Sequence, residues 1–116
     1  MFQVFVENDN IDGLLNIRSS DLGLGLPFNI VSYALLLHMI GHVTGKKGRT
    51  LTVMMGDTHV YKNHIEPLKT QLGRNPRSFP SIKITKKTDN IDDLNIEDFV
   101  LFDYEHEPKI VMEMAA

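Results

Sequence analysis

The sequence predicts one domain, residues 1–116, of the mixed class α/β (or α+β). Short stretches in which apolar residues alternate with polar ones, such as "FQVFV" and "IKITK", are typical of strands. A long apolar stretch from Phe28 to Val43 is typical of a helix inside a core. The 116 residues are 42% apolar and 23% charged, as in a globular chain long enough to bury a core. No repeat or low-complexity tract divides the chain.

The first two elements are expected to form a hairpin. "FQVFV" reads as a strand, "NDNIDG" as the turn, and "LLNIRS" as the returning strand. Because side chains alternate along a strand, Leu15, Ile17 and Ser19 should share one face. Arg18 should then lie on the other face.

The long helix is expected to follow the loop "SDLGLGLP". Pro27 suits a first helical turn, and Gly45 is a common helix-ending residue. The helix is apolar on nearly every side, so we expect it to be packed all round. Its polar residues and its length argue against a membrane span. The first residues do not resemble a signal peptide, so a cytoplasmic (or nuclear) protein is expected.

The second half should hold shorter elements. "LTVMM" reads as a short buried strand, "GDTHVY" as a loop, and "NHIEPLKTQLG" as a helix capped by Asn63. "IKITK" should be a half-exposed strand, "NIDDLNIEDFVLFDY" an acidic turn followed by a strand, and "KIVMEM" a last strand. The carboxylates of residues 89–98 are interpreted as a solvated face.

Charge and cysteine content exclude several functions. The net charge of −3 is unlike that of a general nucleic-acid binder. The chain has no cysteine, which excludes disulfides, thiolate metal sites and a thiol nucleophile. No Ser-His-Asp order and no phosphate-binding GK[ST] loop is visible.

"RSSDLGLGLPFN" carries the first candidate groups. Arg18 and Ser19 could hold a phosphate through a guanidinium fork and a hydroxyl, although a surface arginine beside a turn is the simpler interpretation. Gly23 and Gly25 allow a sharp turn or a close ligand approach but do not complete a dinucleotide fingerprint. The Asn29 carboxamide matches the O4 and N3–H edge of uracil, or it is bonded to the backbone.

The histidines leave several alternatives open. His38 and His42 have the spacing of a metal-binding helix face but lack a third ligand, which favours packing. His59 and Tyr61 would point the same way in an extended chain and could hold one hydroxyl. His59 with Asp57 and His64 could instead suggest a metal, or the stretch is a polar loop.

Taken together, these segments resemble the C-terminal portion of thymidylate synthases. The resemblance covers essentially the whole chain, in order: "RSSDLGLGLPFNIVSYALLLHMI", "GDTHVYKNHIEPLKTQL", "NPRSFPSIKI", "IDDLNIEDF" and "KIVMEMAA". It implies a mixed sheet packed on a long buried helix, with two subunits joined sheet to sheet. The family methylates deoxyuridylate (dUMP) at C5 with 5,10-methylenetetrahydrofolate, and no metal is implied.

The resemblance also implies roles for individual residues. Arg18 and Ser19 would bind the 5′-phosphate, Asn29 the uracil edge, and His59 with Tyr61 the ribose 3′-hydroxyl. Asp21 would contact the nucleotide through its backbone and the folate through its carboxylate. The other folate-side residues would be Leu24, Gly25, Phe28, Met114, Ala115 and Ala116, of which the last three resemble a closing tail. Asparagine at position 29 favours uracil, because related deoxycytidylate hydroxymethylases carry an acid there.

The chain also departs from the family pattern. The family's nucleophile is a cysteine in a Pro-Cys-His stretch that would lie upstream of Met1, and no cysteine is present. Ile17 replaces a usual glutamine and Asn16 a common tyrosine beside the phosphate group. We therefore expect a truncated, split or degenerate synthase without catalytic residues of its own. It would act only with a complementary N-terminal chain, or it is a remnant without turnover that binds nucleotide, a synthase subunit or, by analogy, RNA. An inert gene fragment is the third alternative. The expected assembly is a homodimer or a pair with the complementary N-terminal chain.

Overall fold

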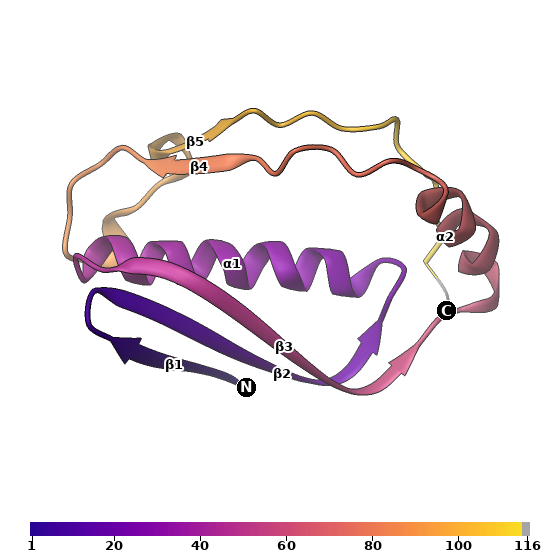
Figure 1. The fold of residues 1–116 in the computed structure, drawn as a ribbon, viewed down its shortest axis with the longest axis horizontal. Coiled ribbons are helices and arrows are strands. Elements are labelled where there is room, and N and C mark those ends of the chain that lie inside the picture. The colour runs from indigo at the N-terminus through magenta and orange to yellow at the C-terminus, as the bar shows by residue number, and fades with distance from the viewer. Residues whose placement is uncertain (115–116) are drawn as a thin grey trace.

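The computed structural model describes residues 1–114, in which strands and helices alternate along most of the chain (Figure 1). In chain order the elements are β1 (Phe2–Glu7), β2 (Asn10–Asp21), α1 (Gly25–Val43), β3 (Lys47–His59), η1 (Lys62–His64), α2 (Ile65–Leu72), β4 (Ser81–Ile84), η2 (Ile91–Asp93), η3 (Ile96–Asp98) and β5 (Phe99–Phe102). The η elements are single 3₁₀ turns. The expected class, a mixed sheet packed on a long helix, is confirmed.

The main sheet has the order β1-β2-β3 and mixes two kinds of pairing. Strands β1 and β2 are antiparallel, and Asn8 turns the chain between them with φ of 54°. Strands β2 and β3 are parallel, which requires a crossover, and α1 supplies it. Gly45, with φ of 66°, turns the chain out of α1 into β3, as expected of a helix-ending glycine.

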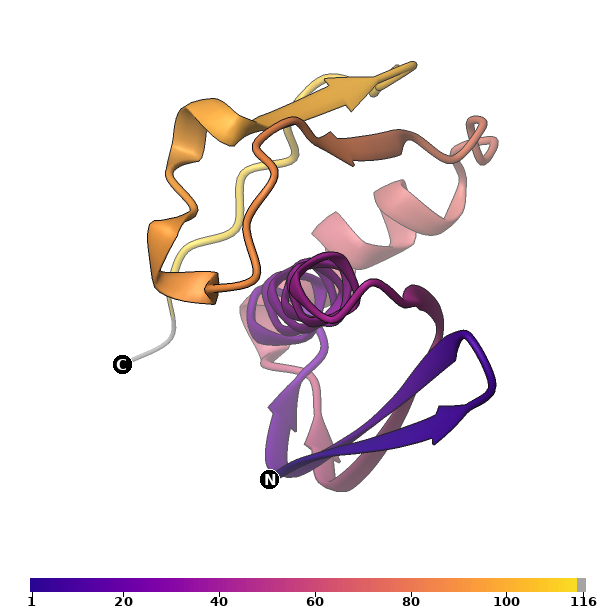
Figure 2. The ribbon, with the colours of Figure 1, turned by 90° about the vertical axis from the view of Figure 1, so that its left-hand side faces the viewer.

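Helix α1 lies between the main sheet and the smaller β4–β5 sheet (Figures 1 and 2). The buried apolar side chains are Ile11 and Leu15 of β2 and Leu37 of α1. Each contributes about 1.5–3 kcal/mol of burial. Gly41 lets the helix approach β3 closely, because a Cβ there would lie 2.7 Å from the Lys46 carbonyl oxygen.

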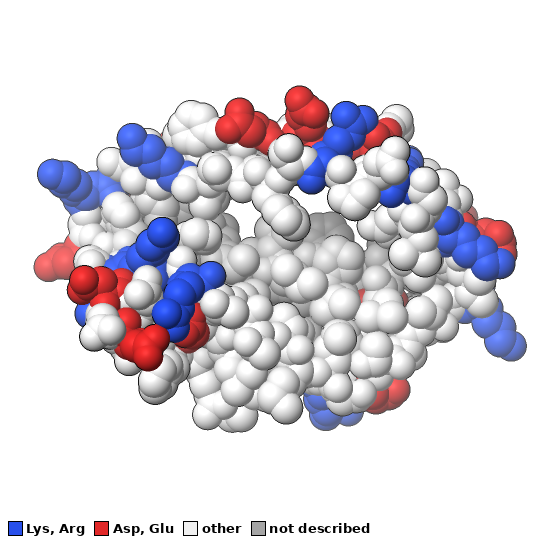
Figure 3. Space-filling view, in the orientation of Figure 1, with Lys and Arg blue, Asp and Glu red and all other residues white. Residues whose placement is uncertain are grey.

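The expectation that α1 is packed on all sides is wrong within this chain. Only Leu37 and Gly41 of the helix are buried, while Phe28 and Val31 are 73% and 67% exposed. Its sequence is apolar all round, but the chain covers only part of its surface. Figure 3 shows the face of the whole molecule seen in Figure 1. The charged side chains lie mostly around the rim of that face, and its middle is largely uncharged.

Helix α1 is also, by length and composition alone, long and apolar enough to cross a membrane. It has 19 residues and a mean hydropathy of 1.4, so the argument from shortness and polarity is wrong by this measure. The helix packs on β2 and β3, but only 11% of this apolar stretch is buried. A single helix of this kind is weak evidence for a membrane span.

Residues 73–114, called here the wrapping segment, pass over the side of α1 that faces away from the main sheet (Figure 1). Its only ladder among the described residues joins β4 and β5, from Ser81↔Phe102 to Ile84↔Phe99. The half-exposed strand expected at "IKITK" is confirmed. The strand expected at "KIVMEM" is wrong: Ile110 and Met112 are partly buried and Val111 is exposed, but the stretch has no neighbouring strand to pair with.

Two further expectations fail near the middle of the chain. The strand at "LTVMM" is neither short nor well buried: β3 runs on through Asp57 and Thr58, since β2 continues beside it to Asp21. Asn63 is not a helix cap; it lies within η1, and α2 begins after His64.

Candidate functional site

Polar residues from distant parts of the chain meet where β2 and β3 end and α1 begins. Asp21 is paired with His59 across the two strands, and the Leu22 N–H donates to the His59 carbonyl oxygen at 3.0 Å. The chain then turns through Gly23 into α1. The ends of two parallel strands and the start of a helix thus lie together, an arrangement that often holds ligands in mixed folds.

The Asp21 carboxylate organises this turn. It accepts hydrogen bonds from the N–H groups of Gly23 (2.9 Å), Leu24 (3.2 Å) and Gly25 (3.2 Å). Partial burial raises the pKa of Asp21, but these three donors and the nearby His64 outweigh it and hold the pKa below its usual value. The carboxylate is therefore ionised at neutral pH and sits favourably before the N-terminus of α1.

His64 lies directly beneath the turn. Its side chain is 1% exposed, and its Nδ1 lies 3.8 Å from Asp21 Oδ1, without a hydrogen-bond partner. A Cβ at Gly23 would lie only 2.5 Å from this Nδ1, so any larger residue there would have to displace the His64 ring. Sequence reasoning considered His64 only as a metal ligand and missed this position, because no local spacing relates it to Asp21.

His59 and Tyr61 lie beside the same turn. Their rings are edge to face, with centroids 5.3 Å apart and planes at 84°, and Tyr61 meets the His64 ring at 5.6 Å in the same manner. The metal alternative for Asp57, His59 and His64 is wrong: within residues 1–114, no three His, Asp or Glu side chains are arranged to hold a metal ion.

Arg18 and Ser19 are exposed, near the end of β2. As neighbours on a strand they direct their side chains to opposite faces. Arg18 lines an open cavity of about 430 Å³, to which β3 contributes Met54 and Met55. His59 and Tyr61 are not among the residues of that cavity.

The residues expected on the base and folate sides come from the turn, the start of α1 and the chain end. Asn29 is half-buried and four residues after Gly25, hence about one helical turn further along the same face. Leu24 and Gly25 are half-buried, while Phe28 is largely exposed. Met114 is 86% exposed, and Ala115 and Ala116 lie outside the described residues.

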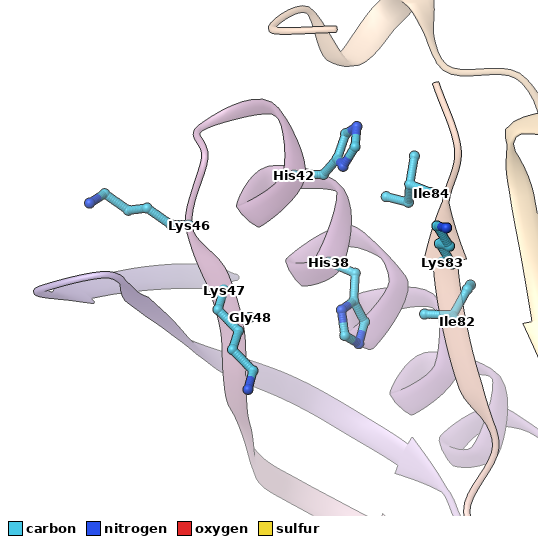
Figure 4. A pocket seen from close by; sticks show the side chains of 8 residues that line it. All are labelled: His38, His42, Lys46, Lys47, Gly48, Ile82, Lys83 and Ile84. Carbon is cyan, nitrogen blue, oxygen red and sulfur yellow. The ribbon is translucent and has the colours of Figure 1, made fainter. Parts of the chain in front are cut away.

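The other two helical histidines belong to a separate place at the far end of α1. His38 and His42 border a cavity of about 390 Å³ between α1, the start of β3 and β4 (Figure 4). His42 points toward β4, and its Nε2 lies 2.6 Å from the Lys86 carbonyl oxygen. Lys46 points away from the cavity. His42 therefore helps to hold the wrapping segment.

Comparison with known proteins gives one consistent result. Residues 1–116 match the thymidylate synthase family. The chain is 51% identical over 113 residues to the thymidylate synthase of Homo sapiens, covering 97% of this chain and 36% of that protein. It is 47% identical to that of Equine herpesvirus 2 and 46% identical to that of Varicella-zoster virus (strain Dumas), again over 97% of this chain and 39% and 38% of those proteins.

The chain therefore spans a little over a third of the length of these relatives. The match extends over the turn at Asp21, the start of α1 and the His59–Tyr61 stretch. By its sequence, the chain belongs to the thymidylate synthase family.

Proposed function

We propose that the chain carries the dUMP-binding half of a thymidylate synthase site. In this proposal Asn29 reads the uracil edge, and His59 and Tyr61 hold the ribose 3′-hydroxyl. Arg18 with Ser19 binds the 5′-phosphate; because the two side chains leave β2 on opposite faces, the long Arg18 side chain has to reach around the strand end to meet the same phosphate as the Ser19 hydroxyl. The backbone at Asp21 supports the nucleotide between them.

One observation carries the proposal: Asp21 pairs with His59 while its carboxylate binds the amides that lead into α1. This arrangement brings His59, Tyr61 and the start of the helix that bears Asn29 to one place. The Arg18 side chain is exposed near the same strand end, where it can meet an anion. A donor fork of this kind suits a phosphate.

The folate side is proposed to involve Asp21, Leu24, Gly25, Phe28, Met114 and Ala115. A cavity of about 230 Å³ opens beside Leu24, between the turn, α2 and the wrapping segment, and Arg74 and Glu107 lie on its wall. Because this volume is below that of common ligand sites, 5,10-methylenetetrahydrofolate would need a wall from another chain. It would enter as co-substrate, the donor of the methyl carbon.

This chain alone is proposed to be inactive. The family reaction begins with a thiolate that adds to C6 of the pyrimidine and makes C5 nucleophilic. The chain has no cysteine to supply this thiolate. Turnover therefore needs a complementary synthase chain that brings the Pro-Cys-His segment, in the cytoplasm where the family works.

The exposed apolar surface favours such a partner. Phe5, Phe28, Val31 and Met54 are each more than half exposed, although they lie on the main sheet and on α1. Surfaces of this kind usually mark interfaces. A second copy of the chain, as in a homodimer, would cover part of this surface but would not supply the cysteine. In that case the chain would be a nucleotide-binding protein without turnover, which is the second candidate function.

A dUMP titration of the purified chain, read by calorimetry and thermal shift, tests the proposal. Binding should raise the melting temperature by mass action, and Arg18→Ala should remove most of the shift. Lys87→Ala is the matched control, because Lys87 is an exposed cation next to Lys86, which contacts the far end of α1. A shift retained in Arg18→Ala, or absent from the parent chain, would refute the phosphate assignment.

A second measurement separates the two candidate functions. Methyl transfer to dUMP is assayed for the chain alone and after mixing with a synthase fragment that contains the Pro-Cys-His segment. Activity only in the mixture supports the enzyme half. Nucleotide binding with no activity in either sample supports the binding protein.

A further inference from the structure

The end of the chain is tied to the candidate site by two side chains of η1. The Glu113 carbonyl oxygen lies 2.7 Å from His64 Nε2 and accepts a hydrogen bond from Asn63 Nδ2 at 3.2 Å. These bonds join residues 49 and 50 positions apart. Since residues 103–114 belong to no strand, this carbonyl is an anchor for the described part of the C-terminal segment, in addition to the ion pairs of Arg77 with Glu105 and Glu107.

The His64 ring is fixed from the opposite side by the Asp21 turn. The backbone of Gly23 lies against the ring, and Asp21 Oδ1 is 3.8 Å from Nδ1. The Tyr61 ring meets it edge-on. One imidazole thus contacts the turn after β2, the stretch after β3 and the C-terminal segment at once.

If the His64 side chain only filled space in the core, it would not need polar ring nitrogens. Nδ1 of His64 is buried without a hydrogen-bond partner, at a cost on the order of 1–3 kcal/mol. A phenylalanine would fill similar space without that cost, but it could not bind the Glu113 carbonyl. Because that oxygen only accepts, the proton must be on Nε2 in either charge state of the ring.

We propose that His64 is a positioning residue that couples the Asp21 turn to the C-terminal segment. Nε2–H holds Glu113, and the Nδ1 edge of the ring lies against Gly23, so its position depends on where the turn lies. A displacement of the turn therefore displaces the end of the chain. That dUMP causes such a displacement rests on the proposed function, whereas the anchoring itself does not.

The first test is the rate at which a carboxypeptidase trims the chain past Met114. His64→Phe should speed trimming through Glu113 about tenfold, since the anchoring bond is lost. His64→Gln, whose side-chain amide can still donate to the carbonyl, should restore most of the protection. His42→Phe is the matched control: it removes another histidine–carbonyl bond, at the far end of α1, and should leave trimming unchanged.

Two measurements keep the test decisive if His64→Phe does not fold. Asn63→Ala removes the weaker, exposed bond to Glu113 and should speed trimming two- to threefold. In the unaltered chain, ¹⁵N NMR should find the His64 proton on Nε2. Equal trimming rates in a folded His64→Phe, or a proton on Nδ1 alone, would overturn the anchor.

Adding dUMP tests the coupling. We expect it to change the trimming rate at least threefold in the parent chain and not in His64→Gln at matched saturation, where the flexible amide does not follow the turn. Binding seen by thermal shift without a change in trimming would overturn the coupling. If dUMP gives no thermal shift, the proposed function and the coupling fall together, while the trimming results still decide the anchor.

Discussion

The βαβ body, formed by β1–β3 and α1, and the wrapping segment are held together in different ways. In the body the β2–β3 ladder runs from Asn10↔Lys47 to Asp21↔His59, and the buried side chains lie against it. The wrapping segment has the short β4–β5 ladder and two histidine–carbonyl contacts, from His42 to Lys86 and from His64 to Glu113. The body is thus stabilised by continuous pairing and burial, and the segment by a few point contacts.

This difference in how the two regions are held indicates that local movement is easier in the wrapping segment than in the βαβ body. Point contacts can open one at a time, whereas a ladder opens cooperatively. The candidate site lies where the two regions meet, with rigid strand ends on one side and the anchored chain end on the other. The comparison can be tested by changes that should affect one region more than the other.

The largest effect is expected in the core of the body. Leu15→Ala should lower the free energy of unfolding by about 2–5 kcal/mol, because it leaves a cavity beneath α1. Leu72→Ala, at a side chain 85% exposed, is the control and should change it by less than about 0.5 kcal/mol. Urea unfolding followed by circular dichroism measures both. If both variants changed the free energy of unfolding by similarly small amounts, Leu15 would not be part of a packed core.

The next effect is expected at the junction. Gly23→Ala should cost about 1–3 kcal/mol, because the new Cβ must push the buried His64 ring away. Gly73→Ala offers a matched control, since the nearest atom to its Cβ would be 3.6 Å away. Thermal melting of both variants makes the comparison. If Gly23→Ala melts like the parent chain, His64 is not packed against the turn.

A smaller and pH-dependent effect is expected for Asp21. Because its pKa is lowered in the folded chain, its stabilisation is complete above the ordinary carboxyl pKa and is lost as pH falls through the lowered value. Asp21→Ala should therefore cost about 1–2 kcal/mol at neutral pH and progressively less in acid. Unfolding of both proteins at several pH values checks the sign. A difference that grows toward acid pH would contradict it.

The smallest effect is expected for His42→Phe. It removes one contact to the Lys86 carbonyl on an exposed edge and should cost about 0.5–1.5 kcal/mol. Amide hydrogen exchange should become faster in β4 and β5 while β2 and β3 keep their protection. Equal acceleration in all four strands would show that the two regions open as one unit.

The sequence by itself determined the elements whose signals are local. The hairpin, the helix ended by Gly45 and the alternating strand at Ile82 and Ile84 were predicted because turn chemistry and apolar periodicity act over a few residues. The hairpin turn expected over "NDNIDG" is shorter in the structure, because β2 already begins at Asn10 and pairs with β1 from there. Family membership, too, can be recognised from the sequence alone, since the segments typical of thymidylate synthases follow one another in order along the chain.

Only the tertiary structure decided the features that depend on distant partners. Strand β3 extends to His59 because β2 lies beside it, and "KIVMEM" forms no strand because nothing pairs with it. Helix α1 is apolar all round, yet how much of it is covered depends on the rest of the chain. His64 gained its place from Gly23 and Glu113, which lie far from it in the sequence. Local patterns carry no signal for such contacts, because they form only when distant segments are brought together by folding.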